Sequence, residues 1–180
     1  MAAFNPLAPA PFQTFVTRGK IRAVFDCMVF LQGAARRESA AGACLRLVEL
    51  EAIELCLSKE ILSEVRDVMA RPRVRQKFSV LTEQFIDNFL AVLEKRAVII
   101  SEVPRVFAYE RDPKDEPYIN LAIAAGARYI VSRDNDLLDL AESFNPNGER
   151  LRHHAPELRI VDVIEFLAEI RRGPHPSVGG

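Results

Sequence analysis

The sequence predicts an α/β fold, a three-layer α/β/α sandwich with a central and mainly parallel sheet. Short strand-like segments alternate along the chain with longer segments of helical periodicity, the pattern of strands joined by helical crossovers. The strand-like segments are almost continuously apolar, as expected for strands covered by helices on both faces. A chain of 180 residues with 49% hydrophobic residues is long enough to form one such domain.

Individual elements follow from apolar periodicity and from residues that start or stop helices. Ser58 suits the N-cap of a helix that continues to residue 69 and stops near Pro72. Pro117 suits the first turn of a helix that Gly126 ends. Strands are expected at residues 21–25, 53–57, 98–103, 129–131 and 158–161. Further helices are expected at residues 39–50, 82–95, 136–141 and 162–172, with an irregular segment at residues 145–156.

Both ends of the chain are expected to lie outside the domain, which spans residues 19–172. Residues 1–18 contain three prolines and no regular pattern, which predicts a poorly ordered extension. Residues 173–180 are rich in proline and glycine, which predicts a flexible tail. We see neither a secretory leader nor an apolar run near the roughly 18 residues that span a bilayer, so we expect a cytoplasmic protein without membrane contact.

Composition also limits the function. The cysteines lack the spacing of a zinc site or a disulfide framework, so we expect buried free thiols at Cys27, Cys44 and Cys56. The net charge of −1 excludes a global attraction to nucleic acid. Local attraction is possible at residues 71–77, which carry four positive charges, although a solvated turn explains them equally well.

Acidic side chains follow two of the predicted buried strands. Asp26 directly follows the first strand, and Asp134 comes shortly after the fourth. The carboxyl ends of strands in an open α/β sheet border the crevice in which ligands bind. Each aspartate could instead cap the next helix. Between Asp134 and Asp136 we assign the cap to Asp136 and a ligand role to Asp134, which lies nearer the strand end.

Two further acids belong to predicted helices. Glu64 borders the apolar stripe of its helix, where it either turns inward or reaches solvent at the edge of the buried face. Asp115 directly precedes a helix, a position that the helix dipole favours for any acid, and Asp112 and Glu116 compete for the same role. Four converging carboxylates would repel one another by about 4 kcal/mol per close pair, so they need protons or cations to coexist. Their hard oxygens suit Mg²⁺ or Mn²⁺, ions that support hydrolysis of phosphodiesters.

These segments resemble the PIN-domain family, in particular the bacterial PIN proteins of toxin–antitoxin pairs. An acid opens a helix in Asp112-Pro113-Lys114-Asp115-Glu116, and a later strand ends in Ser132-Arg133-Asp134-Asn135-Asp136-Leu137-Leu138. The aspartate after the first strand and the glutamate in Ile61-Leu62-Ser63-Glu64-Val65 complete the pattern. The resemblance covers about residues 21–170, nearly the whole domain.

The resemblance implies a metal-dependent endoribonuclease that hydrolyses RNA, single-stranded or locally open, on a PIN-like sandwich. It implies one or two Mg²⁺ or Mn²⁺ ions held by Asp26, Glu64, Asp115 and Asp134, with Asp136 as a further metal-binding residue and Ser132 as a supporting group. It also implies a homodimer and a cognate antitoxin protein as partner. The residues that we expect to contact RNA are Arg71, Arg73, Arg75, Lys77 and Arg133.

One departure from the family pattern keeps a second function open. Met28 stands where the family has Asn, Ser or Thr, and a thioether is only a weak hydrogen-bond acceptor. A PIN-like binding or regulatory module with weak or no nuclease activity is therefore the alternative. A phosphatase of the haloacid-dehalogenase type is disfavoured, because it would need an aspartate at position 28. His153 and His154 have no third metal ligand at suitable spacing, and we expect them at the surface.

Overall fold

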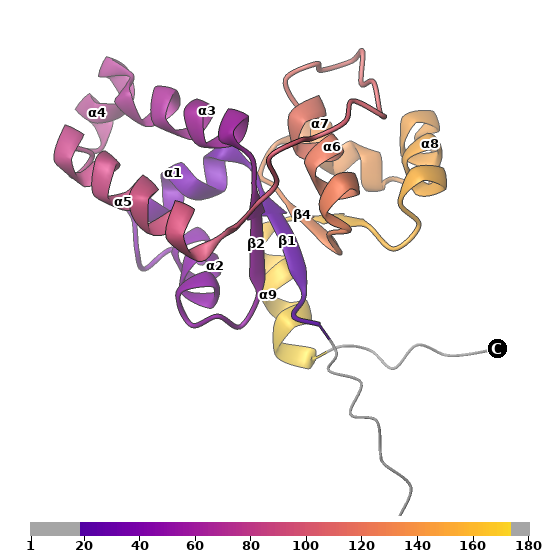
Figure 1. Cartoon of the computed structure of the whole chain (residues 1–180), viewed down its shortest axis with the longest axis horizontal. Coiled ribbons are helices and arrows are strands. Elements are labelled where there is room, and N and C mark those ends of the chain that lie inside the picture. The colour runs from indigo at the N-terminus through magenta and orange to yellow at the C-terminus, as the bar shows by residue number, and fades with distance from the viewer. Residues whose placement is uncertain (1–18, 174–180) are drawn as a thin grey trace, which may run out of the picture.

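A computed structural model describes residues 19–173; the predicted disorder of residues 1–18 and of residues 174–180 lies outside the described residues. At the centre is a sheet of five strands in the order β3-β2-β1-β4-β5 (Figure 1). Every neighbouring pair is parallel. The strands are β1 (Arg22–Phe25), β2 (Glu54–Leu57), β3 (Val98–Ile99), β4 (Tyr129–Val131) and β5 (Arg159–Val161). The expected α/β fold with a parallel sheet is confirmed.

The strand order creates a switch point between β1 and β4. The chain adds β2 and then β3 on one side of β1 and afterwards returns to place β4 on the other side. The first connections after β1 and β4 therefore leave the sheet in opposite directions, which opens a crevice at the carboxyl ends of these two strands. Asp26 and Ser132 directly follow the two strands, so the order of the sheet brings them together.

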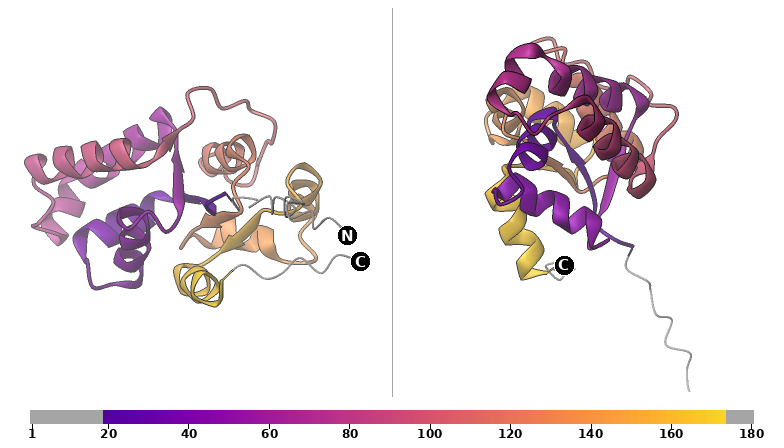
Figure 2. Two further views of the ribbon diagram at one scale, coloured as in Figure 1. Left: turned by 60° about the horizontal axis from the view of Figure 1, so that its bottom comes forward. Right: turned by 90° about the vertical axis from the view of Figure 1, so that its left-hand side faces the viewer.

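Helices cover both faces of the sheet, as expected for a three-layer sandwich. α6 packs against β1, β2 and β4 on one face, and α9 lies with α1 and α2 on the other (Figure 2). The helices α3, α4 and α5 form an arm beside the sheet, with α4 at its outer end (Figure 1). The helices are α1 (Cys27–Ala35), α2 (Ala40–Glu49), α3 (Lys59–Ala70), α4 (Pro72–Lys77), α5 (Glu83–Arg96), α6 (Glu116–Ala125), α7 (Asn135–Leu138), α8 (Pro146–His154) and α9 (Val163–Arg172), with a 3₁₀ turn at Asp139–Ala141.

Two helix termini are fixed as the sequence predicts, one start and one end. The hydroxyl of Ser58 accepts a hydrogen bond from the amide of Ile61 at 3.2 Å and so caps α3. Gly126 ends α6 with a left-handed backbone, φ 59° and ψ 38°, which glycine adopts without steric cost.

The three cysteines are buried and free, as expected. Within residues 19–173, no helix is long and apolar enough to cross a bilayer.

Three helices were not predicted. α1 is almost wholly apolar and buried on most sides, so it has no amphipathic stripe that would signal a helix. α4 buries none of its residues and begins at Pro72, in a segment that the sequence suggested was a turn. The segment expected to be irregular contains α8, which buries only Leu151 and Gly148. His153 and His154 are exposed at the end of α8, in agreement with the predicted surface position.

The third strand is shorter than predicted. The chain between this strand and α6, residues 100–115, is called the strap. Only Val98 and Ile99 pair with β2; the expected strand 98–103 is wrong beyond residue 99, apart from one hydrogen bond from the amide of Ile100 to Leu57. The following residues cross the molecule without regular structure and lead to α6 (Figure 1).

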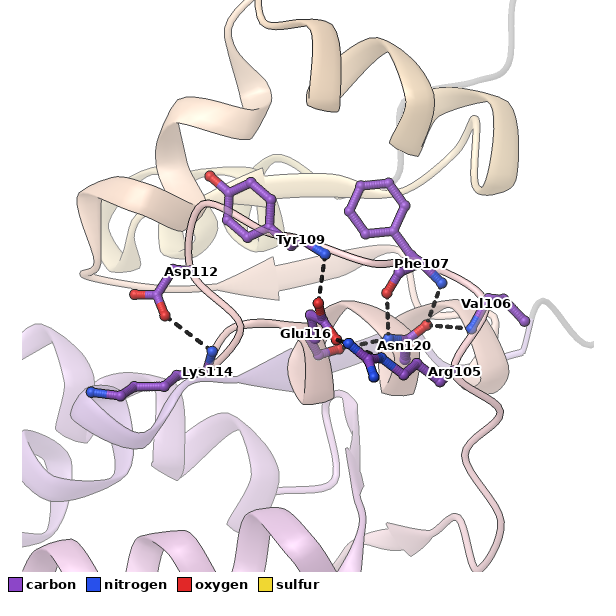
Figure 3. Close-up of polar contacts among 8 residues, drawn as sticks. All are labelled: Arg105, Val106, Phe107, Tyr109, Asp112, Lys114, Glu116 and Asn120. Atoms are coloured by element: carbon purple, nitrogen blue, oxygen red, sulfur yellow. Dashed lines mark hydrogen bonds and ion pairs between the residues drawn. The ribbon is translucent and has the colours of Figure 1, made fainter.

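Two side chains of α6 hold this strap in place (Figure 3). The amide oxygen of Asn120 accepts hydrogen bonds from the backbone N–H groups of Val106 and Phe107 at 2.9 and 2.8 Å, and its nitrogen donates to Phe107 O at 2.8 Å. Glu116 accepts from the amide of Tyr109 at 2.7 Å and pairs with Arg105 at 2.7 Å. These contacts fix the backbone of the strap against α6 just before the chain arrives at Asp115.

Candidate metal centre

Asp26 is buried at the end of β1, where it also caps α1. Its Oδ1 accepts a hydrogen bond from the amide of Val29 at 2.8 Å, and its Oδ2 accepts one from the amide of Arg133 at 2.9 Å. Only 4% of the residue is exposed. Burial raises the pKa of this carboxyl above its ordinary value, against the opposing effect of its hydrogen bonds. Asp26 therefore does both things that the sequence left open: it caps the next helix, and it lies at the carboxyl end of β1 where a ligand would bind.

Ser132 connects the ends of β1 and β4. Its hydroxyl donates to Oδ2 of Asp26 and accepts a hydrogen bond from the amide of Asp134 at 2.8 Å. The residue is fully buried, and its own amide donates to Val161 O of β5 at 3.0 Å. The predicted supporting group therefore orients one acid and the backbone of another.

We expect replacement Ser132→Ala to lower stability by about 2 kcal/mol, because two buried polar groups lose their partner. If Ser132 orients Asp26 as proposed below, Mn²⁺-dependent cleavage should also fall about 10- to 100-fold. Thermal unfolding and cleavage rates measured below the melting temperature check both effects. Ser39→Ala, which removes the N-cap of α2, is the control that should lower stability by about 1 kcal/mol without changing cleavage. Equal cleavage by the two variants would contradict this role of Ser132.

Asp115 stands at the N-terminus of α6, but its side chain does not cap the helix. The residue is 7% exposed, and its Oδ2 is buried without any hydrogen-bond partner among the described residues. Burial is the main cause that raises its pKa to about 7, and the negative charges of Asp134, Asp112, Asp136 and Asp26 add to the increase. A buried carboxylate oxygen without a donor is costly, so this position favours a proton or a cation.

Glu64 comes from α3 and is half-buried, as its place beside the apolar stripe predicts. Its Oε2 accepts a hydrogen bond from the hydroxyl of Tyr118 at 2.7 Å. Tyr118 lies on α6, one turn after Asp115, and is 3% exposed.

One cavity of about 320 Å³ collects these side chains at the carboxyl ends of β1 and β4. Asp26, Glu64, Asp115 and Asp134 all line it. The cavity therefore brings together the four acids that the sequence singled out. Its other lining residues are Cys27, Met28, Val68, Arg71, Asp112, Lys114 and Tyr118.

The structure changes the roles of three neighbouring acids. Asp134, not Asp136, caps α7, because its Oδ1 accepts the amide of Asp136 at 2.8 Å; the assignment of the cap to Asp136 is wrong. Asp136 is absent from the cavity lining, and its carboxylate pairs with Arg111 at 2.8 Å. Glu116 faces the strap and is bound there, so of the two competitors of Asp115 only Asp112 reaches the cavity.

Three cavity residues have roles that sequence reasoning missed or left open. Asp112 was weighed only as a competitor of Asp115, yet both line the cavity. Lys114 brings a positive charge to the same place, and its position between the two aspartates is the signal that could have suggested it. Tyr118 could have been found from its spacing on the helix, since residues i and i+3 share a face.

The acidic side chains suit a cation, but within residues 19–173 they are not gathered around a single metal position. Within residues 19–173, no three His, Cys, Asp and Glu side chains converge as a ready-made metal site. The donor set nevertheless fits a hard divalent ion, because it offers carboxylate oxygens. One of them is buried and has no hydrogen-bond partner in the described part of the chain.

The chain belongs to the PIN-domain family, because the family model described as PIN domain matches residues 22–136. PIN domains are generally nucleases. A solved structure that resembles this chain is the crystal structure of PAE2754 from Pyrobaculum aerophilum, with 13% sequence identity and a TM-score of 0.46. The similarity covers 84% of this chain and 98% of that one. No curated protein matches the chain significantly.

Proposed function

We propose that this PIN protein is a Mg²⁺- or Mn²⁺-dependent endoribonuclease that hydrolyses phosphodiester bonds of single-stranded or locally open RNA. The observation that carries the proposal is the buried Oδ2 of Asp115, which has no hydrogen-bond partner within residues 19–173, in a cavity that Asp26, Glu64 and Asp134 also line. A divalent ion would give the buried Oδ2 of Asp115 a partner, and it would offset the mutual repulsion of these acids.

The proposed reaction needs a divalent ion, residues that hold it and residues that orient those ligands. A bound Mg²⁺ or Mn²⁺ ion would lower the pKa of a water and offset the charge that develops at phosphorus. Asp26, Glu64, Asp115 and Asp134 would hold the ion. Ser132 and the amide of Arg133 fix the carboxylate of Asp26, so that it need not reorganise during the reaction. Asp136 remains a proposed supporting acid that acts from its ion pair with Arg111.

The proposed RNA path starts at the rim of the cavity. Arg71 lines the cavity and also precedes α4, whose exposed Arg73 and Lys77 continue the positive charge outward. Arg75 is half-buried and pairs with Glu83 at 3.4 Å, and the side chain of Arg133 donates to Gln32 at 2.6 Å. Arg73 and Lys77 are therefore the best groups for testing phosphate contacts.

We expect the double replacement Arg73→Gln/Lys77→Gln to raise KM for RNA about tenfold and to leave kcat unchanged. The salt dependence of log KM should become shallower by about 1.4, since each phosphate contact to a single strand contributes about 0.7. Arg171→Gln/Arg172→Gln removes two exposed charges from the far end of α9 and serves as the matched control. An equal effect of both double variants would rule out a specific RNA path along α4.

The test of the function is cleavage of a mixed single-stranded RNA by the purified protein in Mn²⁺. Cleavage should disappear in EDTA and in Asp26→Asn. As the toxin of a toxin–antitoxin pair, the wild-type protein should also arrest growth when expressed in bacteria, and Asp26→Asn should not. A cognate antitoxin and a homodimer remain proposed partners, which co-purification and sedimentation of the full chain would test.

Met28 supports a second candidate function. It is 40% exposed and lines the cavity, so a thioether occupies a position where the family has a polar side chain. In this case the protein would be a binding or regulatory module. RNA binding in saturating Mn²⁺ without turnover would support the module over the nuclease.

A further inference from the structure

A hydrogen bond between two helices lies inside the acidic cavity. The hydroxyl of Tyr118 on α6 donates to Oε2 of Glu64 on α3 at 2.7 Å, and both residues line the cavity. Tyr118 is 3% exposed, so its ring is held by packing while its hydroxyl reaches the cavity lining. The bond occupies Oε2 of Glu64 and leaves Oε1 for another partner.

The position of Tyr118 on α6 ties Glu64 to Asp115. The amide of Tyr118 donates to the carbonyl oxygen of Asp115 at 3.1 Å, so the two residues belong to the same first turn. Glu64 comes from a different helix and would otherwise be free to choose among several rotamers, since glutamate has three rotatable bonds. The hydroxyl of Tyr118 thus sets the direction of one acid relative to another.

We propose that Tyr118 is a positioning residue that orients Glu64 as a ligand of the divalent ion. This inference rests on the proposed function, because it assigns Tyr118 a role in that same site. A hydrogen bond from a neighbouring group commonly orients a metal-binding side chain, and its loss weakens metal binding about 10- to 100-fold. The purely structural explanation is that Tyr118 only satisfies its own buried hydroxyl.

The chain contains a matched pair that separates the two explanations. Tyr129 is 4% exposed, and its hydroxyl donates to Oε2 of Glu169 at 2.6 Å. This pair has the same kind of hydrogen bond and a similarly buried tyrosine. Glu169 also pairs with Arg159, and neither Tyr129 nor Glu169 lines the acidic cavity. Tyr118→Phe and Tyr129→Phe therefore remove the same group from the same kind of bond.

The experiment is calorimetric titration of Mn²⁺ into the full-length wild-type protein and both variants, together with thermal unfolding. Tyr118→Phe should raise the Kd for Mn²⁺ about 10- to 100-fold, and Tyr129→Phe should leave it unchanged. Both variants should fold and lose similar stability. Cleavage by Tyr118→Phe should recover at high Mn²⁺ to within about threefold of the wild-type kcat, because the ligands themselves remain.

A double-mutant cycle tests whether Tyr118 acts through Glu64. In Glu64→Gln the further change Tyr118→Phe should have little additional effect on the Kd for Mn²⁺, since the ligand that Tyr118 orients is already lost. Additive effects would overturn the inference, as would an unchanged Kd in Tyr118→Phe or an equal rise in Tyr129→Phe. In each of these cases the wild-type protein still binds Mn²⁺ and the proposed function stands. Absence of Mn²⁺ binding by the wild-type protein would instead overturn both.

Discussion

Asp26→Asn should reduce Mn²⁺-dependent RNA cleavage by at least about 10³-fold, a loss of about 4 kcal/mol of transition-state stabilisation. The change removes the negative charge from the innermost acid of the cavity. Asparagine can still accept the hydrogen bond from Val29 and cap α1 about as well as aspartate. In that orientation the amide of Arg133 loses its acceptor, but the cost of burying a charge also disappears, so we expect the melting temperature to change by less than about 4 °C.

A matched control for this change is Asp162→Asn. Asp162 directly follows β5 and caps α9 through the amides of Ile164 and Glu165, yet it does not line the acidic cavity. This variant should cleave RNA at the wild-type rate. Cleavage by Asp26→Asn within about tenfold of the wild type, with both proteins folded, would show that Asp26 does not hold the ion.

Asp115→Asn should make the metal-free protein more stable at neutral and higher pH. The pKa of Asp115 is about 7 in the folded protein and near the ordinary value of 3.8 when unfolded. Between these values the folded state binds more protons than the unfolded state, so the stability of the wild-type protein falls as pH rises from about 4 to 7. Allowing for solvent screening, we expect this variant to gain about 1–2 kcal/mol at pH 8, or roughly 3–6 °C.

The same change should abolish the effect of the ion on stability. Mn²⁺ should raise the melting temperature of the wild-type protein at pH 8. The increase should be much smaller at pH 5, where a proton on Asp115 competes with the ion. In Asp115→Asn the shift should be lost at both pH values, and cleavage should fall about 10³-fold. Differential scanning calorimetry in EDTA and in Mn²⁺ measures these quantities. A variant with the wild-type pH dependence and the wild-type Mn²⁺ shift would contradict the role given to Asp115.

Much of the sheet could be predicted because its strands are short, apolar and bounded by clear helix signals. Ser58 and Gly126 mark helix ends through local hydrogen bonds and backbone geometry, which depend on the nearby sequence alone. α1 could not be predicted in this way. Its residues are apolar on almost every side because most of the helix is buried, so the alternation on which prediction depends is missing.

The candidate site shows the same division between local and distant information. The position of Asp26 after a buried strand is local, and the general rule for parallel sheets then predicts a place in the crevice. The choice between Asp134 and Asp136 as the cap depends on backbone geometry, which the sequence of two aspartates only two positions apart does not reveal. The partner of Glu64 is Tyr118, 54 residues away, and no local pattern indicates that contact.

The most direct test of the account is the chemistry of the ends that the protein leaves on a labelled single-stranded RNA in Mn²⁺. Hydrolysis by an activated water leaves one free hydroxyl and one phosphate monoester at each cut, whereas attack by the neighbouring 2′-hydroxyl leaves a 2′,3′-cyclic phosphate. We predict monoester ends from the wild-type protein and from Asp162→Asn, and no cuts in EDTA or with Asp26→Asn. Cyclic phosphate ends, or cuts that persist in EDTA, would contradict a metal-dependent hydrolase.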